Sequence, residues 1–304
     1  QGIEVTLTGD RSLSGRPMRR VTEPLSLMGA SIETSEGGTA PLVIRPVASL
    51  QGVDYRLPMA SAQVKSCLLL AGLYAEGQTC VTEPAPTRDH TERMLAGLGY
   101  TVQREGSRAC LTGGGRLVAC DIDVPADISS AAFFLVGATI AEDSDLTLEH
   151  VGMNPTRIGV INILRLMGAN IEVFNEREVG GEPVADLRVR AASLHGIAIP
   201  EDQVPLAIDE FPALFIAAAC ARGETVLTRA AELRVKESDR IQVMADGLAR
   251  LGIEVRPTPD GIVIRGGAFN GSRINSHGDH RIAMAFAMAA LRAGAEIRID
   301  DCEN

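Results

Sequence analysis

Two carboxylates stand beside basic residues at places where the sequence predicts helix starts. Glu237 lies between Lys236 and Arg240 in "LRVKESDR", and Asp209 opens "DEFPALFIAAA". A helix N-terminus carries unpaired N–H groups and the positive end of the helix dipole, so cations there are slightly unfavourable unless an anion opposes them. Carboxylates in such surroundings suit general acid–base chemistry on an anionic ligand. The plainer interpretations are an N-cap for Asp209 and a neighbouring ion pair for Glu237.

The same pattern recurs elsewhere in the chain. Other basic residues at expected helix starts are Arg16 beside Pro17, Arg88 after the candidate N-cap Thr87, Arg157 after Thr156, and His280 with Arg281 after Asp279. Ser61 and Gln63 bring hydrogen-bond donors to a further start. Arg and Lys bind phosphate and carboxylate through charge-assisted bonds. We predict a cationic site whose charges are opposed by a small anionic ligand rather than by protein; for any single residue, a solvated surface arginine is the alternative.

Two kinds of helix are expected to position these residues. The first kind is an amphipathic helix that ends in a left-handed glycine and leads into a strand. It recurs at Gly29, Gly99, Gly168 and Gly252. The last of these helices is predicted over residues 232–252, with Lys236 near its start. Helices apolar nearly all round alternate with them, at 61–77, 127–143, 209–223 and 279–294. A period of roughly seventy residues favours repeated βαβαββ units in an α/β (α+β) fold. Ordinary α/β alternation with accidental spacing is the alternative.

Composition indicates a protein with a large core. The chain has 304 residues, 45% of them hydrophobic, enough for two domains, which we expect at 1–124 and 125–304. A net charge of −10 argues against nucleic acid as a partner. Its apolar runs are too short to span a bilayer, and no secretory leader is recognised, so we expect a cytoplasmic protein. Six cysteines without CxxC spacing predict reduced, buried thiols and no metal site.

Several motifs together resemble the 5-enolpyruvylshikimate-3-phosphate synthase family. They are "GDRSLSGRPM", "SAQVKSCLLLAGLYA", "VPADISSAAFFLV", "DEFPALFIAAA", "LRVKESDR" and "GDHRIAMAFAMAAL", and the resemblance runs from end to end. It implies two domains of βαβαββ units around a central cleft toward which helix N-termini point. It implies transfer of the enolpyruvyl group of phosphoenolpyruvate to the 5-hydroxyl of shikimate 3-phosphate, with release of phosphate, in the pathway to chorismate and the aromatic amino acids. No cofactor or metal is implied, and the full-length form is expected to be a monomer.

The resemblance also implies roles for individual residues. The shikimate 3-phosphate contacts are Ser61, Ala62, Gln63, Arg88, Asp209 and Lys236. The phosphoenolpyruvate contacts are Arg16, Gln63, Arg240, His280 and Arg281. Asp209 is implied to take the proton of the attacking hydroxyl, and Glu237 to exchange protons at the methylene carbon.

The chain also departs from the family pattern. Glu232 stands where some members have Asn, and the family's N-terminal Lys-Ser…Arg motif, Gly-Asn-Ala-Gly-Thr loop and C-terminal phosphate-binding segment do not occur in these residues. We therefore expect the 304 residues alone to be an inactive fragment. A sister family acting on UDP-N-acetylglucosamine shares the fold, but it usually has Cys where this chain has Arg11. The second alternative is a non-catalytic, anion-binding repeat module.

Overall fold

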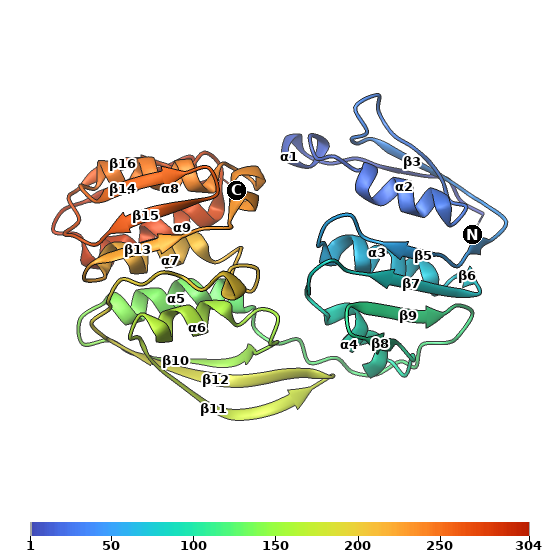
Figure 1. The fold of residues 1–304 in the computed structure, drawn as a ribbon, viewed down its shortest axis with the longest axis horizontal. Helices are drawn as coiled ribbons and strands as arrows, with labels where there is room; N and C mark the ends of the chain where they lie inside the picture. The colour runs from blue at the N-terminus through green and yellow to red at the C-terminus, as the bar shows by residue number, and fades with distance from the viewer. Residues whose placement is uncertain (1, 304) are drawn as a thin grey trace. The chain divides into compact units, whose positions relative to one another are not determined.

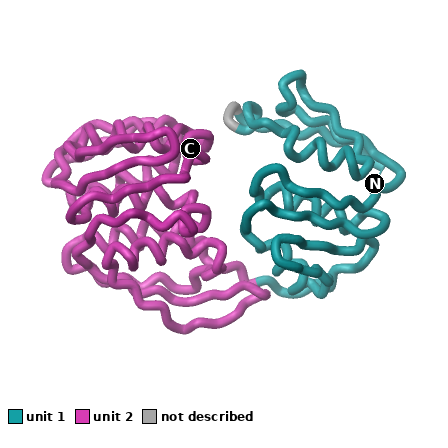
Figure 2. Tube along the Cα trace, viewed as in Figure 1, with its two compact units in different colours: residues 1–122 teal, residues 123–304 magenta. Residues whose placement is uncertain are grey.

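Residues 2–303 are described by a computed structural model and fold as two compact units that divide between residues 122 and 123 (Figure 2). The division lies inside the glycine-containing stretch 111–129, close to the expected boundary after residue 124. The assignment of the units to substrate domains and the central cleft between domains stay predictions.

Unit 1 alternates short strands with helices (Figure 1). Its elements are β1 (Val5–Leu7), α1 (Arg11–Ser14), α2 (Arg19–Leu27), β2 (Ser31–Glu33), β3 (Leu42–Arg45), β4 (Leu50–Gln51), β5 (Asp54–Arg56), α3 (Ala62–Gly72), β6 (Ala75–Glu76), β7 (Gln78–Thr82), α4 (His90–Gly97), β8 (Gln103–Glu105) and β9 (Arg108–Thr112).

Unit 2 continues the alternation with longer elements (Figure 1). They are α5 (Ile128–Ile140), β10 (Asp145–Gly152), α6 (Gly159–Leu166), β11 (Asn170–Val179), β12 (Glu182–Arg190), η1 (Glu201–Gln203), α7 (Phe211–Cys220), β13 (Glu224–Leu227), η2 (Ala231–Val235), α8 (Arg240–Arg250), β14 (Glu254–Thr258), β15 (Gly261–Arg265), β16 (Ser272–Asn275), α9 (His280–Ala289), η3 (Ala290–Arg292) and β17 (Ile297–Asp300).

One strand arrangement recurs through both units. In the sheets β1-β3-β2, β10-β12-β11 and β13-β15-β14, the strand that comes last in sequence lies between the other two. The four-stranded sheet β5-β7-β9-β8 has the same order after a leading parallel strand, and β16 pairs with β17 in the same parallel way. This is the βαβαββ pattern predicted from the sequence period, so the repeat is confirmed over accidental alternation.

The glycines that mark the repeat have the conformation predicted for them. Gly29, Gly99, Gly168 and Gly252 have φ between +76° and +98°, each just past the end of its helix. A side chain is strained in this region, so glycine ends the helix and turns the chain toward the next strand.

The apolar helices form the core of unit 2. Residues Phe211 to Ala219 of α7 are all buried, and α7 packs against both α5 and α9, which also pack against each other. Helices α5 and α6 lie on the same side of the sheet β10-β12-β11 (Figure 1). Helix α8 also contacts α7 and α9. Hydrogen bonds from Arg240 to Asp279 and from Arg281 to the carbonyl of Asp209 show that these three helices begin close together.

The cysteine prediction is wrong for one pair. Cys80 on β7 and Cys110 on β9 form a disulfide, with a Cα–Cα distance of 4.1 Å. The two strands are antiparallel neighbours whose register places these residues directly opposite, which spacing along the chain does not reveal. Of the remaining cysteines, Cys120 and Cys302 are exposed rather than buried. Within residues 2–303, no helix has the length and apolar character needed to cross a membrane.

Candidate active site in unit 2

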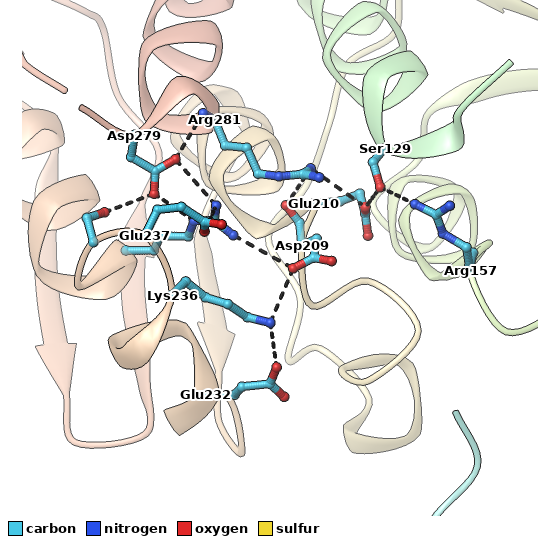
Figure 3. Close-up of polar contacts among 11 residues, drawn as sticks. Ser129, Arg157, Asp209, Glu210, Glu232, Lys236, Glu237, Asp279 and Arg281 are labelled. Carbon is cyan, nitrogen blue, oxygen red and sulfur yellow. Dashed lines mark hydrogen bonds and ion pairs between the residues drawn. The ribbon is translucent and has the colours of Figure 1, made fainter. Parts of the chain in front are cut away.

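Polar side chains of unit 2 meet where α7, α8 and α9 begin (Figure 3). Asp209 lies two residues before α7, Arg240 is the first residue of α8, and Arg281 is the second residue of α9. Lys236 and Glu237 come from the turn that follows η2. The sequence predicted these five residues for one site, and the fold brings all five together.

The predicted single helix over 232–252 is wrong. Residues Ala231–Val235 form a short 3-10 helix, Lys236 has the extended backbone angles φ −80° and ψ −152°, and α8 begins only at Arg240. Asp239 caps α8 by accepting the Gln242 amide at 3.0 Å. The break frees Lys236 from the helix surface, so its side chain reaches Asp209 instead of lying in line with Arg240.

Arg240 is the most buried cation of the site, with 1% of its side chain exposed. Its Nε donates to Oδ2 of Asp279 at 2.9 Å, and its Nη2 donates to Oε2 of Glu237 at 2.6 Å. Nη1 lies 3.7 Å from Oδ1 of Asp209. The planar guanidinium therefore holds two carboxylates by hydrogen bonds and attracts the third by its charge.

Asp279 is the anchor of this group and is fully buried. It caps α9 by accepting the Arg281 amide at 3.0 Å, and it also accepts the Ser238 hydroxyl at 3.0 Å. Burial opposes ionisation, but the hydrogen bond and charge of Arg240, together with these two donors, hold the pKa of Asp279 below its usual range. Asp279 is therefore a carboxylate that keeps Arg240 and the start of α9 in place.

Asp209 does not act as the N-cap that the plainer interpretation proposed. The N-cap position of α7 belongs to Glu210, which makes no side-chain cap, and the helix begins with Phe211 and Pro212. The Asp209 carboxylate instead lies 3.3 Å from Nζ of Lys236. A carboxylate that lies within 4 Å of two cations, with 17% of its side chain exposed, is suited to accept a proton from a ligand hydroxyl.

The prediction that only a ligand opposes these cations is wrong for unit 2. Lys236 pairs with Glu232 as well as Asp209, Arg240 contacts three carboxylates, and Nη1 of Arg281 lies 3.9 Å from Glu210. A helix start disfavours a cation by only a few tenths of a kcal/mol, which neighbouring carboxylates readily offset. An arriving anionic ligand must therefore share these cations with protein carboxylates.

The remaining predicted site residue of unit 2 is His280, which follows Asp279 in the chain. His280 is the first residue of α9 and is exposed. Asp279, Ser238 and Glu210 were not predicted as site residues, although each adjoins a predicted one in sequence. The signal for Asp279 was its place directly before the helix start, where Asp is a favoured N-cap.

In unit 1, the predicted triplet stands at a helix start. Ser61 caps α3 by accepting the Val64 amide at 3.4 Å, and Ala62 and Gln63 are the first two helical residues. The Gln63 side chain is exposed, whereas Ser61 is buried. This agrees with the sequence prediction that polar groups are presented at this helix N-terminus.

Two other helix starts in unit 1 are displaced from their predicted places. Helix α4 begins at His90 with Asp89 in the N-cap position, so Arg88 lies just outside it, and Thr87 bonds Glu83 instead of capping. Arg16 follows the single turn α1, while α2 begins at Arg19. For Arg16 the proline misled the prediction, because Pro17 precedes the first turn of α2 rather than lying in it.

Thr156 is likewise not a cap, and α6 begins only at Gly159. The Thr156 hydroxyl donates to Oδ1 of Asn154 at 2.6 Å. Arg157, which follows it, pairs with Asp127 at 2.9 Å.

A buried lysine supports the unit 1 residues. Lys65 of α3 has no exposed surface, and its Nζ lies 3.0 Å from Oε2 of Glu83 and 2.9 Å from Oε1 of Glu92. These bonds tie α3, which Ser61 caps, to both ends of the segment that carries Arg88. Among residues 2–303 no group of three or more His, Cys, Asp or Glu side chains is placed to hold a metal ion.

The chain matches known proteins over its whole length. The family profile described as EPSP synthase (3-phosphoshikimate 1-carboxyvinyltransferase) matches residues 1–304. A 3-phosphoshikimate 1-carboxyvinyltransferase of Alkalilimnicola ehrlichii is 71% identical over 305 residues, covering 100% of this chain and 68% of that protein. The protein of the same name from Methylococcus capsulatus is 71% identical over 304 residues, covering 100% of this chain and 70% of its own.

A solved structure supports the same relationship. The EPSP synthase of Acinetobacter baumannii is 61% identical and superposes with a TM-score of 0.91, over 100% of this chain and 70% of that one. These matches describe neither of the two alternatives considered above, the family acting on UDP-N-acetylglucosamine and a non-catalytic anion-binding module. The chain therefore belongs to the EPSP synthase family, the 3-phosphoshikimate 1-carboxyvinyltransferases.

Proposed function

We propose that the group at the starts of α7, α8 and α9 contains the reacting side chains of enolpyruvyl transfer. The chain is a transferase of the shikimate pathway that moves the enolpyruvyl group of phosphoenolpyruvate to the 5-hydroxyl of shikimate 3-phosphate. The observation that carries the proposal is the convergence of Asp209, Lys236, Glu237, Arg240 and Arg281 from separate segments (Figure 3).

Asp209 is the proposed base. As the 5-hydroxyl oxygen bonds to the central carbon of phosphoenolpyruvate, its proton passes to the Asp209 carboxylate. Lys236, 3.3 Å from that carboxylate, is close enough to contact the same hydroxyl and a ligand phosphate. A cation there stabilises negative charge as it develops on the reacting oxygens.

Glu237 is the proposed acid. It donates a proton to the methylene carbon as the new C–O bond forms, which yields a tetrahedral intermediate. As phosphate leaves, it takes up the proton that Asp209 had accepted. Glu237 takes a proton back from the same carbon, the double bond is restored, and both side chains return to their starting states. Its hydrogen bond from Nη2 of Arg240 at 2.6 Å holds the carboxyl group in one place through both steps.

The remaining predicted residues are proposed binding contacts. Ser61, Ala62, Gln63 and Arg88 are assigned to shikimate 3-phosphate, while Arg16, His280 and Arg281 are assigned to phosphoenolpyruvate, with Arg240 and Gln63. Each phosphate brings a charge of about −1.5 to −2, which explains the number of cations. Such charged metabolites do not cross a bilayer unaided, so we also place the enzyme in the cytoplasm, where its substrates are made.

Isosteric substitution tests the two carboxylates. In the product of the complete reading frame, Asp209→Asn and Glu237→Gln should each lower kcat about 10²- to 10⁴-fold. Glu237→Gln should in addition abolish exchange of solvent deuterium into the methylene group of phosphoenolpyruvate. The matched control is Glu254→Gln, which removes a carboxylate from an exposed pair with Arg265 on the sheet β13-β15-β14. Undiminished exchange in Glu237→Gln contradicts the proposed acid.

A further inference from the structure

Glu210 is a buried carboxyl group to which the proposed mechanism gives no role. It directly follows Asp209 in the chain and is 2% exposed. Asp209 is directed toward Lys236 and Arg240, whereas Glu210 is directed the other way, toward Ser129 and Arg281 (Figure 3). Two neighbouring carboxyl groups thus serve two different sets of partners.

On one side, Glu210 is held by a chain of polar contacts. Oε1 of Glu210 accepts the hydroxyl of Ser129, and the Ser129 oxygen in turn accepts Nη2 of Arg157 at 2.5 Å. Arg157 also pairs with Asp127, the N-cap of α5, at 2.9 Å. Because the Ser129 oxygen accepts from Arg157, its hydrogen is free for Glu210, and the orientation of the hydroxyl is determined.

On the other side, Glu210 faces Arg281. Nη1 of Arg281 lies 3.9 Å from Oε1 of Glu210 and donates to the backbone carbonyl of Asp209 at 3.0 Å. The Arg281 side chain is 17% exposed, and Nη1 of its guanidinium is packed against the start of α7. The two contacts set the direction in which the remaining donors of the guanidinium point.

The charges around Glu210 are mixed. Burial raises its pKa, and the neighbouring Asp209 adds to the rise, while the Ser129 hydroxyl and the charges of Arg281 and Arg157 act in the opposite direction. Asp127 is a further titratable group on this side. Burial opposes its ionisation, but Arg157 and the amides and hydroxyl at the start of α5 outweigh burial and lower its pKa.

We propose that Glu210 is a positioning residue that aims Arg281 at phosphoenolpyruvate, with its own position set by Ser129 and Arg157. This inference rests on the proposed role of Arg281 as a phosphoenolpyruvate contact. It gives Arg157, a cation at a predicted helix start, an indirect part in the reaction. The competing interpretation is that Glu210 only joins the starts of α5, α7 and α9.

Steady-state kinetics of the complete enzyme separate the two interpretations. Glu210→Ala should raise the KM for phosphoenolpyruvate about ten-fold, since small misplacements of a binding group are costly, and leave the KM for shikimate 3-phosphate within about two-fold. Glu210→Gln should restore the KM for phosphoenolpyruvate to within about three-fold of wild type, because its amide oxygen can accept the same Ser129 hydroxyl. Equal changes in both KM values, or a Gln variant no better than Ala, would overturn the proposal.

Two further variants complete the test. Ser129→Ala keeps Glu210 but removes the hydrogen bond that Glu210 accepts, and should raise the KM for phosphoenolpyruvate about three-fold. If Glu210→Ala does not fold, Ser129→Ala takes its place in the test. An unchanged KM for phosphoenolpyruvate in Ser129→Ala then counts against the proposal. Arg281→Ala tests the proposed function itself. If Arg281→Ala leaves the KM for phosphoenolpyruvate unchanged, the assigned role of Arg281 fails. If it raises that KM while Glu210→Ala does not, only the positioning role fails.

Discussion

Replacing Asp279 by asparagine isolates the buried charge that anchors the site. The Asp279 side chain is wholly inaccessible and accepts bonds from Arg240, Ser238 and the Arg281 amide. Asparagine has the same shape and is an equally good N-cap, so the cap to Arg281 can be kept. What is lost is the negative charge that opposes Arg240, together with the acceptor Oδ2 that takes the bonds of Arg240 and Ser238.

The expected cost follows from the surroundings of Arg240. Removing one partner of a buried ion pair typically destabilises a protein by about 3–5 kcal/mol. Arg240 keeps contacts to Glu237 and Asp209, which places Asp279→Asn near the lower end, about 3 kcal/mol. Asp279→Ala also loses the cap, worth about 1 kcal/mol, and should cost about 4 kcal/mol.

Hydrogen exchange of the α7 amides measures this cost in unit 2 itself. Residues Phe211 to Ala219 are buried, so their exchange at neutral pH reports the opening of the core without assuming that both units unfold together. A loss of about 3 kcal/mol corresponds to exchange about 150-fold faster than in wild type. The pKa of Asp279 is lowered in the folded state. The greater stability of wild type over Asp279→Asn should therefore be fully present above about pH 4 and shrink as the pH falls through the folded pKa of Asp279.

The matched control is Asp239→Asn. Asp239 also caps a helix and pairs with Arg234 at 2.7 Å, but 38% of its side chain is exposed, so its loss should cost less than about 1 kcal/mol. Two results would refute the reasoning. One is an amide exchange rate in Asp279→Asn within five-fold of the wild-type rate; the other is a stability difference between wild type and Asp279→Asn that grows below pH 4.

Three further perturbations test other parts of the structure. The pKa of Glu210 is raised in the folded state. The contribution of Glu210 to stability is therefore present at pH values below the ordinary glutamate pKa of about 4.3, and it is lost as the pH rises through the folded pKa. The free energy of unfolding of Glu210→Gln should therefore rise relative to wild type between pH 4 and pH 8, as urea unfolding can show. Lys65→Met leaves the carboxylates of Glu83 and Glu92 buried without a cation, and should destabilise unit 1 by about 3–5 kcal/mol in exchange of the α3 amides. Reduction of the disulfide, which joins residues 30 apart, should lower the stability of unit 1 by about 3–4 kcal/mol, seen as a lower Tm with reductant.

Each of these has a contrary outcome. A stability difference between wild type and Glu210→Gln that is constant with pH would mean that burial does not shift this carboxyl group. A Lys65→Met variant as stable as wild type would mean that Glu83 and Glu92 take up protons or reach water without cost. An unchanged Tm on reduction, with both thiols shown to be free, would mean that the closed loop adds nothing to stability.

The repeat could be read from the sequence because it depends on local rules. A glycine after an amphipathic helix predicts a left-handed turn wherever it occurs, and Gly29, Gly99, Gly168 and Gly252 all have it. The order of amphipathic and apolar helices then indicated several βαβαββ units. Likewise, a motif such as "DHRIAM" marks a helix start whatever its surroundings, and α9 begins at His280.

The exact helix starts were less predictable. Lys236 and Arg88 lie just outside helices that the sequence pattern would extend to include them. Competing side-chain bonds, such as that of Thr87 to Glu83, decide these boundaries, and they form between residues whose distance apart is set by the fold.

Local sequence thus determined which residues are suited to the chemistry and which helices present them. Only the tertiary structure decided their partners: that Asp279 anchors Arg240, 39 positions away in the chain, that Cys80 lies opposite Cys110, and that carboxylates already oppose the cations. The reason is physical. Backbone conformation follows from neighbours a few residues away, whereas the charge, burial and hydrogen bonds of a side chain depend on segments that packing alone brings together.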